Sequence, residues 1–389
     1  MSRESIGGNF LAAPIGQSAE KQTSMTKTVA MLAVVGLTGC AGKPLDLGGA
    51  GGGPQGTHST AIANHQRNAA SLHSEGSHLY WTTYDAAEGD RANKICRCRK
   101  DDCAATQQTL FATRDAGRLL IRNGRAYFRH NGGIVGCFVE DCGAPQVIIA
   151  RASGAPGVID DSHVYWWSTQ DHALLSCPLT GCDEPSVAVA RVGLIIDAAV
   201  DDAHLFWSVW ESSRTQAIRS AAKYGTPPTS GNQVDSLHML SALVLDDAFV
   251  YWGENLSSGK VARTRKIIPN LGEAPIETLA SGQYYPRAFA LDYDVLFWMN
   301  ESVPEDQLTR VERLAKIMSC ILPSCETSIE VLDEAGGGSL ANPIDTYFGG
   351  GTLVVDAQAI YYIGDVARVG SSQDLVDASI RRLPRRPDR

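Results

Sequence analysis

Apolar and polar residues alternate along the chain in short runs, which are separated by clusters of Asp, Ser and Gly. One unit, PGVIDDSHVYWWSTQDHALLSCPLTGCDEPSVAVA, contains four such runs: PGVI, HVYWWS, HALLSC and PSVAVA. Val, Tyr and Trp at the apolar positions are typical of β-strands. The Asp and Ser residues between the first two runs favour a tight turn, because their side chains hydrogen-bond to nearby backbone. The unit therefore predicts a four-stranded antiparallel sheet.

The run that carries an aromatic pair occurs seven times along the chain. Its first aromatic residues are Tyr80, Tyr127, Tyr165, Phe206, Tyr251, Phe297 and Tyr361. A period of roughly 40 to 50 residues made of short β-runs is typical of propeller blades, whereas a helical repeat needs longer amphipathic runs. We predict an all-β fold, a seven-bladed β-propeller of four-stranded antiparallel blades, over residues 58–389.

The last unit ends after SIRRL, at residues 379–383, which is only its third strand. Residues Thr60 to Asn64 match the outer strand of the other units. We predict that they complete the last blade and close the ring, which removes the exposed edges of an open sheet. In the alternative, this segment is a linker and the ring has six complete blades.

Residues Met25 to Cys40, MTKTVAMLAVVGLTGC, combine a basic start with an apolar run that is too short to span a membrane as a helix. The run resembles a bacterial lipoprotein signal ending in a lipobox. That resemblance implies a leader and signal at 1–40, acylation (palmitate) of Cys40, and a Gly-rich tether at 41–57. Ala41 after the cysteine favours the outer membrane. The alternative is a buried apolar strand with an ordinary cysteine.

The chain has ten cysteines. Eight of them form four pairs with the same spacing, which we predict to be disulfides across hairpins: Cys98 with Cys103, Cys137 with Cys142, Cys177 with Cys182, and Cys320 with Cys325. Such bonds indicate an oxidising compartment. A metal site would need four thiolates at one ion, but the pairs lie on different blades. Cys96 is left over, either as a free thiol or as a competitor of Cys98 for Cys103.

The repeat of inner strand, acidic turn and Val-Tyr-Trp resembles the YWTD propellers of lipoprotein receptors and the related NHL and TolB-like propellers. The resemblance covers residues 58–389. The Thr and Asp that follow Tyr-Trp in the YWTD pattern are kept only as Thr82. The resemblance therefore implies the architecture but no receptor-type ligand site, since propellers carry many unrelated functions.

The loops after the aromatic pairs vary in sequence and share one face of the predicted ring, so we expect them to bind a ligand. The candidate contacts are Tyr84, Asp85, His130, Asp171, His172, Trp210, Glu211, Glu254, Asn300, Glu301 and Asp365. Their acidic groups would attract cations or basic ligands, unless the loops are simply a solvated surface. The insertion from Asp333 to Gly351 is expected on the same face, either as a cover of the channel or as a surface loop.

Three histidines occupy the same position in different blades, so they should be spread around the ring and should not converge on a metal: His78, His163 and His204. Paired aspartates precede the second strands and are interpreted as turn formers, with calcium binding as the alternative: Asp160, Asp161, Asp201, Asp202, Asp246 and Asp247.

The sequence contains no GxSxG, HExxH, Walker or Rossmann motif. Its 34 basic and 43 acidic residues argue against general nucleic-acid binding. We predict a monomeric envelope lipoprotein that binds a protein or glycan through its loops, without a cofactor. The alternatives are an assembly factor for outer-membrane proteins and a calcium-assisted hydrolase, lyase or sugar oxidoreductase.

Overall fold

The computed structural model of the chain describes residues 40, 59–85, 88–89, 92–190, 192–210, 215–223, 231–237, 239–266, 275–302, 314–335, 353–368 and 376–385. The chain divides into two compact units, Met1–Leu37 and Thr38–Arg389, and all of the described residues belong to the second. No helix in this described part is long and apolar enough to cross a bilayer.

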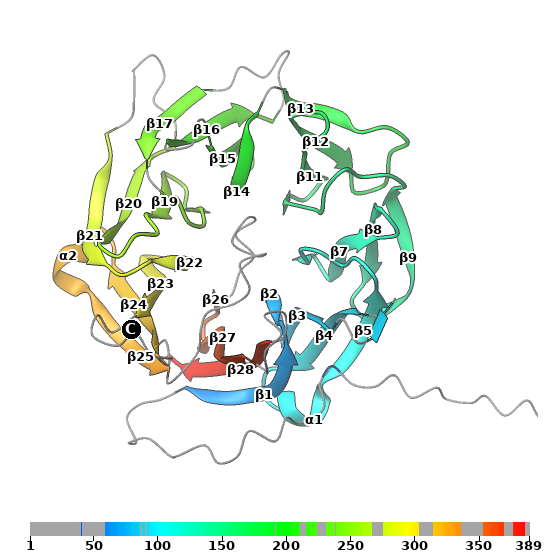
Figure 1. The fold of residues 1–389 in the computed structure, drawn as a ribbon, viewed down its shortest axis with the longest axis horizontal. Coiled ribbons are helices and arrows are strands. Elements are labelled where there is room, and N and C mark those ends of the chain that lie inside the picture. The colour runs from blue at the N-terminus through cyan, green and yellow to red at the C-terminus, as the bar shows by residue number, and fades with distance from the viewer. Residues whose placement is uncertain are drawn as a thin grey trace, which may run out of the picture. The chain divides into compact units, whose positions relative to one another are not determined.

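The described strands form seven four-stranded antiparallel sheets arranged in a ring (Figure 1), which confirms the predicted seven-bladed propeller. Blade 1 contains β2 (Ala70–Glu75), β3 (His78–Tyr84), β4 (Asn93–Arg99) and β5 (Gln108–Thr113). Blade 2 contains β6 (Leu120–Arg122), β7 (Arg125–His130), β8 (Gly133–Phe138) and β9 (Asp141–Ile149). Blade 3 contains β10 (Val158–Ile159), β11 (His163–Ser168), β12 (Ala173–Pro178) and β13 (Ser186–Ala190).

Blades 4 to 6 follow the same order from the inner to the outer strand. Blade 4 contains β14 (Leu194–Val200), β15 (His204–Trp210), β16 (Gln216–Ala222) and β17 (Gly231–Leu237). Blade 5 contains β18 (Val244–Leu245), β19 (Phe249–Gly253), β20 (Gly259–Arg265) and β21 (Glu277–Gln283). Blade 6 contains β22 (Arg287–Asp292), β23 (Val295–Ser302), β24 (Leu314–Ile321) and β25 (Glu330–Ala335).

Blade 7 is assembled from both ends of the chain. From the inside outward, its first three strands are β26 (Leu353–Val355), β27 (Ala359–Arg368) and β28 (Val376–Pro384), and its outer strand is β1 (Thr60–Arg67). Thr60 lies opposite Arg382, and Arg67 lies opposite Asp377. Figure 1 shows β1 in blue beside β28 in red. The predicted closure is confirmed, with a strand longer than Thr60 to Asn64, and the six-bladed alternative is wrong.

The two aromatic residues of each second strand pack against the two neighbouring blades, one on each side, because successive side chains of a strand point to opposite faces of the sheet. Trp166 lies in the cluster between blades 2 and 3, with Tyr127 and Ile148. Its neighbour Tyr165 lies in the next cluster, with Val189 and Trp207. Burial of these aromatic side chains on both faces holds adjacent blades together.

Two short helices lie between the third and outer strands of blades 1 and 6: α1 (Cys103–Thr106) and α2 (Cys325–Ser328). The predicted insertion starts too early, because Asp333 belongs to β25, where only 4% of it is exposed. It begins no earlier than residue 336, and residues 336–352 lie outside the described part of the chain.

Candidate functional site

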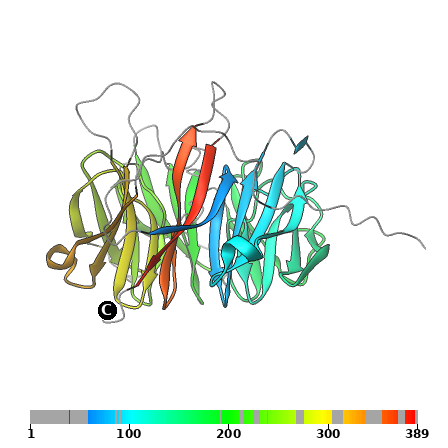
Figure 2. The same ribbon diagram turned by 90° about the horizontal axis from the view of Figure 1, so that it is seen from below.

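Neighbouring strands in every blade are antiparallel, so the connections alternate between two faces of the ring (Figure 2). We call "turn face" the face with the turns from the first to the second strand and from the third to the outer strand. We call "loop face" the opposite face, which carries the loops from the second to the third strand. The predicted ligand contacts come from the loop face of different blades.

On blades 1 and 2, Asp85 and His130 are engaged by neighbouring side chains, whereas Tyr84 is exposed. Tyr84 is 38% exposed at the end of β3. Asp85 is paired with Arg67, with 2.6 Å between the carboxylate and guanidinium atoms. His130 Nδ1 lies 2.8 Å from the hydroxyl of Thr113, and its ring packs edge-on against Phe111.

On blades 3 and 4 the loop residues differ in exposure. Ser168 donates a hydrogen bond of 2.6 Å to the carboxylate of Asp171 and accepts one of 3.0 Å from its backbone N–H. The adjacent His172 is exposed and has a φ of 48°, which is uncommon for a residue with a side chain. Trp210 is half-buried against the core cluster between blades 4 and 5.

On blade 5, Glu254 is paired with Lys260 at 3.1 Å. On blade 6, Asn300 is only 8% exposed, accepts a hydrogen bond from Trp298 Nε1 at 3.0 Å and donates one to Gln283 at 2.8 Å. This geometry favours a packing role for Asn300 over ligand contact. The side chains of Glu211, Glu301 and Asp365 lie outside the described part of the structure.

The structure adds Asp115 to the loop face, a residue that the sequence analysis missed. Its carboxylate accepts hydrogen bonds from the backbone N–H groups of Asn131 (3.1 Å) and Gly132 (3.2 Å). Arg129 lies 3.5 Å from the same carboxylate. Asp115 lies in the connection between β5 and β6, and from there it fixes the tight loop between β7 and β8.

Three charged or titratable residues of the channel wall were also missed. Arg118 Nη1, before the inner strand of blade 2, lies 3.2 Å from Asp197 Oδ1 on the inner strand of blade 4. The other carboxylate oxygen of Asp197 accepts the Leu243 N–H at 2.8 Å, at the entry to blade 5. This ion pair therefore connects blades that are not neighbours in the ring. One signal was visible in the sequence, because Asp197 is the only charged residue in the run LIIDAAV.

His73 is the third of these residues and lies on the inner strand of blade 1. Its Nε2 lies 2.6 Å from the Leu119 carbonyl oxygen of blade 2. Burial lowers the pKa of His73 to about 4, and the nearby charge of Arg118 acts in the same direction. His73 is therefore neutral near pH 7 and donates Nε2–H to that carbonyl.

On the turn face, the first aspartate of each pair forms the turn, as predicted. Asp160 accepts the N–H groups of Ser162 (2.7 Å) and His163 (2.8 Å). Asp201 and Asp246 make the same two bonds in their own blades. The histidines lie one per blade at the start of the second strand, where the rings of His78 and His163 pack 6.2 and 6.0 Å from the following tyrosines. Within the described residues, no group of three or more His, Cys, Asp or Glu is placed to hold a metal ion.

The turn aspartates also join adjacent blades, which the sequence analysis did not foresee. Asp160 of blade 3 pairs with Lys223 of blade 4 at 2.8 Å. The same arrangement recurs at three more junctions of the described structure, between Asp201 and Lys266, Asp292 and Arg385, and Asp356 and Lys100. Each basic residue directly follows the third strand of its blade.

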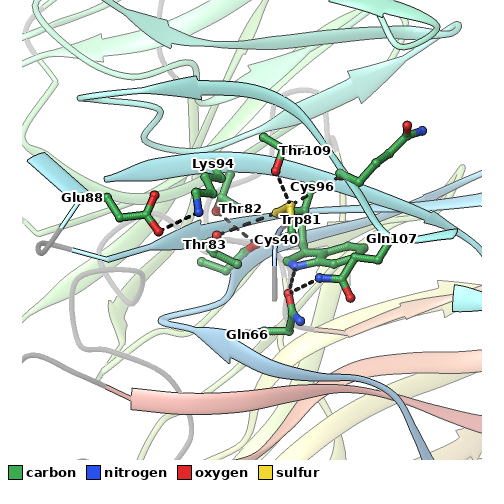
Figure 3. The surroundings of a disulfide bond; sticks show 12 residues. Cys40, Gln66, Trp81, Thr82, Thr83, Glu88, Lys94, Cys96, Gln107 and Thr109 are labelled. Carbon is green, nitrogen blue, oxygen red and sulfur yellow. Dashed lines mark hydrogen bonds and ion pairs between the residues drawn. A yellow bond between two sulfur atoms is a disulfide. The ribbon is translucent and has the colours of Figure 1, made fainter. Parts of the chain in front are cut away.

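All ten cysteines are bonded. The four predicted hairpin disulfides are present, with Cα–Cα distances of 4.8 to 5.8 Å. Cys96 is neither a free thiol nor a competitor for Cys103, because it is bonded to Cys40 with a Cα–Cα distance of 5.9 Å (Figure 3). An acyl anchor on Cys40 needs the same sulfur atom, so one molecule carries either the lipid or this disulfide. Acylation of Cys40 stays a prediction.

No protein-family model and no curated protein matches the sequence. Among solved structures, puromycin hydrolase is similar with a TM-score of 0.53 and 12% identity, over 79% of this chain and 52% of that one. The chain is a β-propeller. The propeller spans about half the length of puromycin hydrolase.

Two further solved structures have lower TM-scores. They are BamB from Moraxella catarrhalis (0.43, 14% identity, 80% of this chain and 84% of that one) and TolB from Agrobacterium tumefaciens (0.42, 10% identity, 72% and 94%). At these identities the likeness concerns the fold alone.

Proposed function

We propose that the propeller is an exported binding module of the bacterial cell envelope, which holds a protein or glycan partner on its loop face. The observation that carries this proposal is that hydrogen bonds to nearby side chains already hold loops of this face in place. Asp115 holds the backbone at Asn131 and Gly132, and Asp171 is bonded to Ser168. A surface that is ordered before binding loses less conformational entropy when the partner docks.

The charge pattern of the loop face favours polar and aromatic recognition. Asp85 and Glu254 each have a basic partner within 3.1 Å, so their negative charge is already balanced locally. Exposed Tyr84 and His172 offer ring faces and hydrogen-bonding atoms. Such side chains suit a sugar or a polar protein surface better than a strongly cationic ligand.

The five disulfides support export, because such bonds persist in oxidising compartments. Location at the cell envelope is the finer part of the proposal, and it does not require a lipid on Cys40, whose sulfur is bonded to Cys96. It rests on the resemblance of residues 25–40 to a lipoprotein signal.

The catalytic alternative, a calcium-assisted hydrolase, lyase or sugar oxidoreductase, requires carboxylates that converge on the channel with free oxygen atoms. Asp197 is a buried carboxylate on the inner strand of blade 4, and its oxygens are bonded to Arg118 and to the Leu243 N–H. This arrangement favours a structural role for Asp197 over a catalytic one.

The test compares substitutions on the two faces of the ring. The loop-face variant carries Tyr84→Ala and His172→Asn, since Asn tolerates the positive φ of this position. The control is Tyr293→Ala, because Tyr293 is 93% exposed in a turn on the turn face. Glycan arrays and crosslinking in whole cells should give a partner that the wild type and the control retain and the loop-face variant loses. Loss in the control, or full retention by the loop-face variant, would contradict the proposal.

A further inference from the structure

The N-terminal segment is held at two points by equivalent positions of neighbouring blades. Cys96 lies opposite Trp81 in blade 1, and Arg381 lies opposite Tyr362 in blade 7, so both residues occupy the same site on a third strand. Cys96 is bonded to Cys40. Arg381 donates hydrogen bonds to the hydroxyl of Ser59 at 2.8 Å and to its carbonyl at 2.6 Å.

The second hold, at Ser59, is buried. Ser59 is 4% exposed, its hydroxyl lies 2.5 Å from that of Tyr362, and its N–H donates to Asp333 at 3.3 Å. Tyr362 also donates to Asp333 at 2.5 Å. This network places the start of β1 between blades 6 and 7, so residues 40 and 59 are fixed on either side of blade 7.

The first hold, at Cys40, lies in the apolar junction between blades 7 and 1. Cys40 is 3% exposed and Cys96 is 0% exposed. Both belong to one apolar cluster with Trp81 of blade 1 and with Tyr361 and Ile380 of blade 7. Figure 3 shows Cys40 beside Cys96, with Trp81 next to them. A sulfur that carried a diacylglyceryl group would not fit this enclosed site, because the lipid must reach a membrane.

We propose that the bond between Cys40 and Cys96 is a latch that fixes the N-terminal segment at the junction of blades 7 and 1, and that in the folded exported protein the Cys40 sulfur is bonded to Cys96 and not to a lipid. The two thiols lose two protons and two electrons as the S–S bond forms. The electrons pass to an oxidised protein disulfide of the export compartment, which becomes a dithiol. Cys98 does not compete for Cys96, since it is bonded to Cys103.

The latch is tested by mapping the disulfides of the full chain. Protein from the soluble and membrane fractions of the native cells is alkylated without reduction, digested and analysed by mass spectrometry. The expected result is a Cys40 peptide linked to the Cys96 peptide in most molecules. A Cys40 peptide with the mass of a diacylglyceryl thioether, together with alkylated Cys96 in most molecules, would overturn the proposal.

The inference rests on the export part of the proposed function and not on its binding part, and the same map separates the two. If the four hairpin pairs are bonded while Cys40 and Cys96 are alkylated, the latch alone fails. If all five pairs are alkylated, export to an oxidising compartment fails as well. Neither result depends on the loop-face binding test.

Substitution of Cys96 is a second test of the bond between Cys40 and Cys96. Cys96→Ser removes the partner of Cys40, so Cys40 should become alkylated or acylated in nearly all molecules. The matched control is Cys177→Ser, since Cys177 is also 0% exposed on a third strand but is bonded to Cys182. The control should leave the Cys40 to Cys96 link intact. If Cys40 is modified equally in the wild type and in Cys96→Ser, the latch is refuted.

Discussion

Lys223 Nζ lies 2.8 Å from Asp160 Oδ2 and joins the third strand of blade 4 to the inner turn of blade 3. The side chain of Lys223 is 4% exposed and that of Asp160 is 11% exposed. The same carboxylate accepts the hydroxyl of Tyr165 at 2.9 Å and two backbone N–H groups of its turn. One aspartate therefore connects a turn, a packed aromatic residue and the neighbouring blade.

The first prediction concerns this pair. Lys223→Met should lower the free energy of unfolding by about 2 to 4 kcal/mol, because it leaves a largely buried carboxylate without its cation. Urea denaturation at pH 7 measures the change. Arg99→Ala is the control, since Arg99 and Asp101 form an ion pair with both side chains more than half exposed, and its free energy of unfolding should not change. Equal free energies of unfolding for both variants would contradict the prediction.

The second prediction follows from the pKa of the turn aspartates. Burial alone would raise the pKa of Asp160, but the hydrogen bonds from Lys223, Ser162 and His163 outweigh it and lower the pKa below 3.8. The pKa values of Asp201 and Asp356 are lowered in the same way. A folded-state pKa below the unfolded one stabilises the fold above pH 3.8, and this contribution is lost as the pH falls further. Denaturation at pH 5 and pH 3 should show the loss, and Lys223→Met should reduce it.

The third prediction places His73 in a different pH range. Its folded-state pKa of about 4 lies below the ordinary value of 6.5. The unfolded chain therefore binds the proton first, and stability falls as the pH drops from 6.5 to 4, by about 3 kcal/mol. His73→Gln keeps an N–H donor near the Leu119 carbonyl but does not titrate, so it should flatten this part of the pH profile. An unchanged profile in the variant would show that another group is responsible.

Local sequence was sufficient for the architecture. The aromatic pair and the turn aspartates act within a few residues of the chain, so Tyr165 and Asp160 could be assigned to a strand and a turn without coordinates. The ring closure followed from one incomplete unit. Both inferences concern strand pairing, which alternation and turn residues largely determine.

Contacts between blades were not predictable in the same way. Lys223 and Asp160 are 63 residues apart, and Cys40 and Cys96 are 56 apart. Such pairs depend on how each blade is rotated against the next, which a single repeat does not encode. For the same reason Asn300 was assigned to a binding loop, although Trp298 and Gln283 hold its side chain in the interior. The basic residue after the third strand was a visible signal for the ion pairs.

The fourth prediction ranks the disulfides by the loops that they close. In the chain-entropy model, removal of the Cys40 to Cys96 bond, with a separation of 56 residues, costs about 4 kcal/mol. Removal of a hairpin bond with a separation of five residues costs about 2 kcal/mol. We expect the double variant Cys40→Ala, Cys96→Ala to unfold at a lower urea concentration than Cys137→Ala, Cys142→Ala. The reverse order would contradict the ranking.

The last prediction concerns Gln66 at the end of β1, which is 0% exposed and accepts a hydrogen bond of 2.9 Å from Trp81 Nε1. Gln283 and Trp298 repeat this bond at the same separation of 15 residues between blades 5 and 6. Gln66→Leu would leave the buried indole N–H without its partner and should cost about 1 to 3 kcal/mol. Because Gln66 belongs to the strand that closes the ring, hydrogen exchange should rise first in β1 and β28. Gln283→Leu is the comparison at another junction, where Trp298 Nε1 keeps its bond to Asn300, and it should raise exchange in blades 5 and 6. If both variants raise exchange uniformly around the ring, Gln66 has no special part in closure.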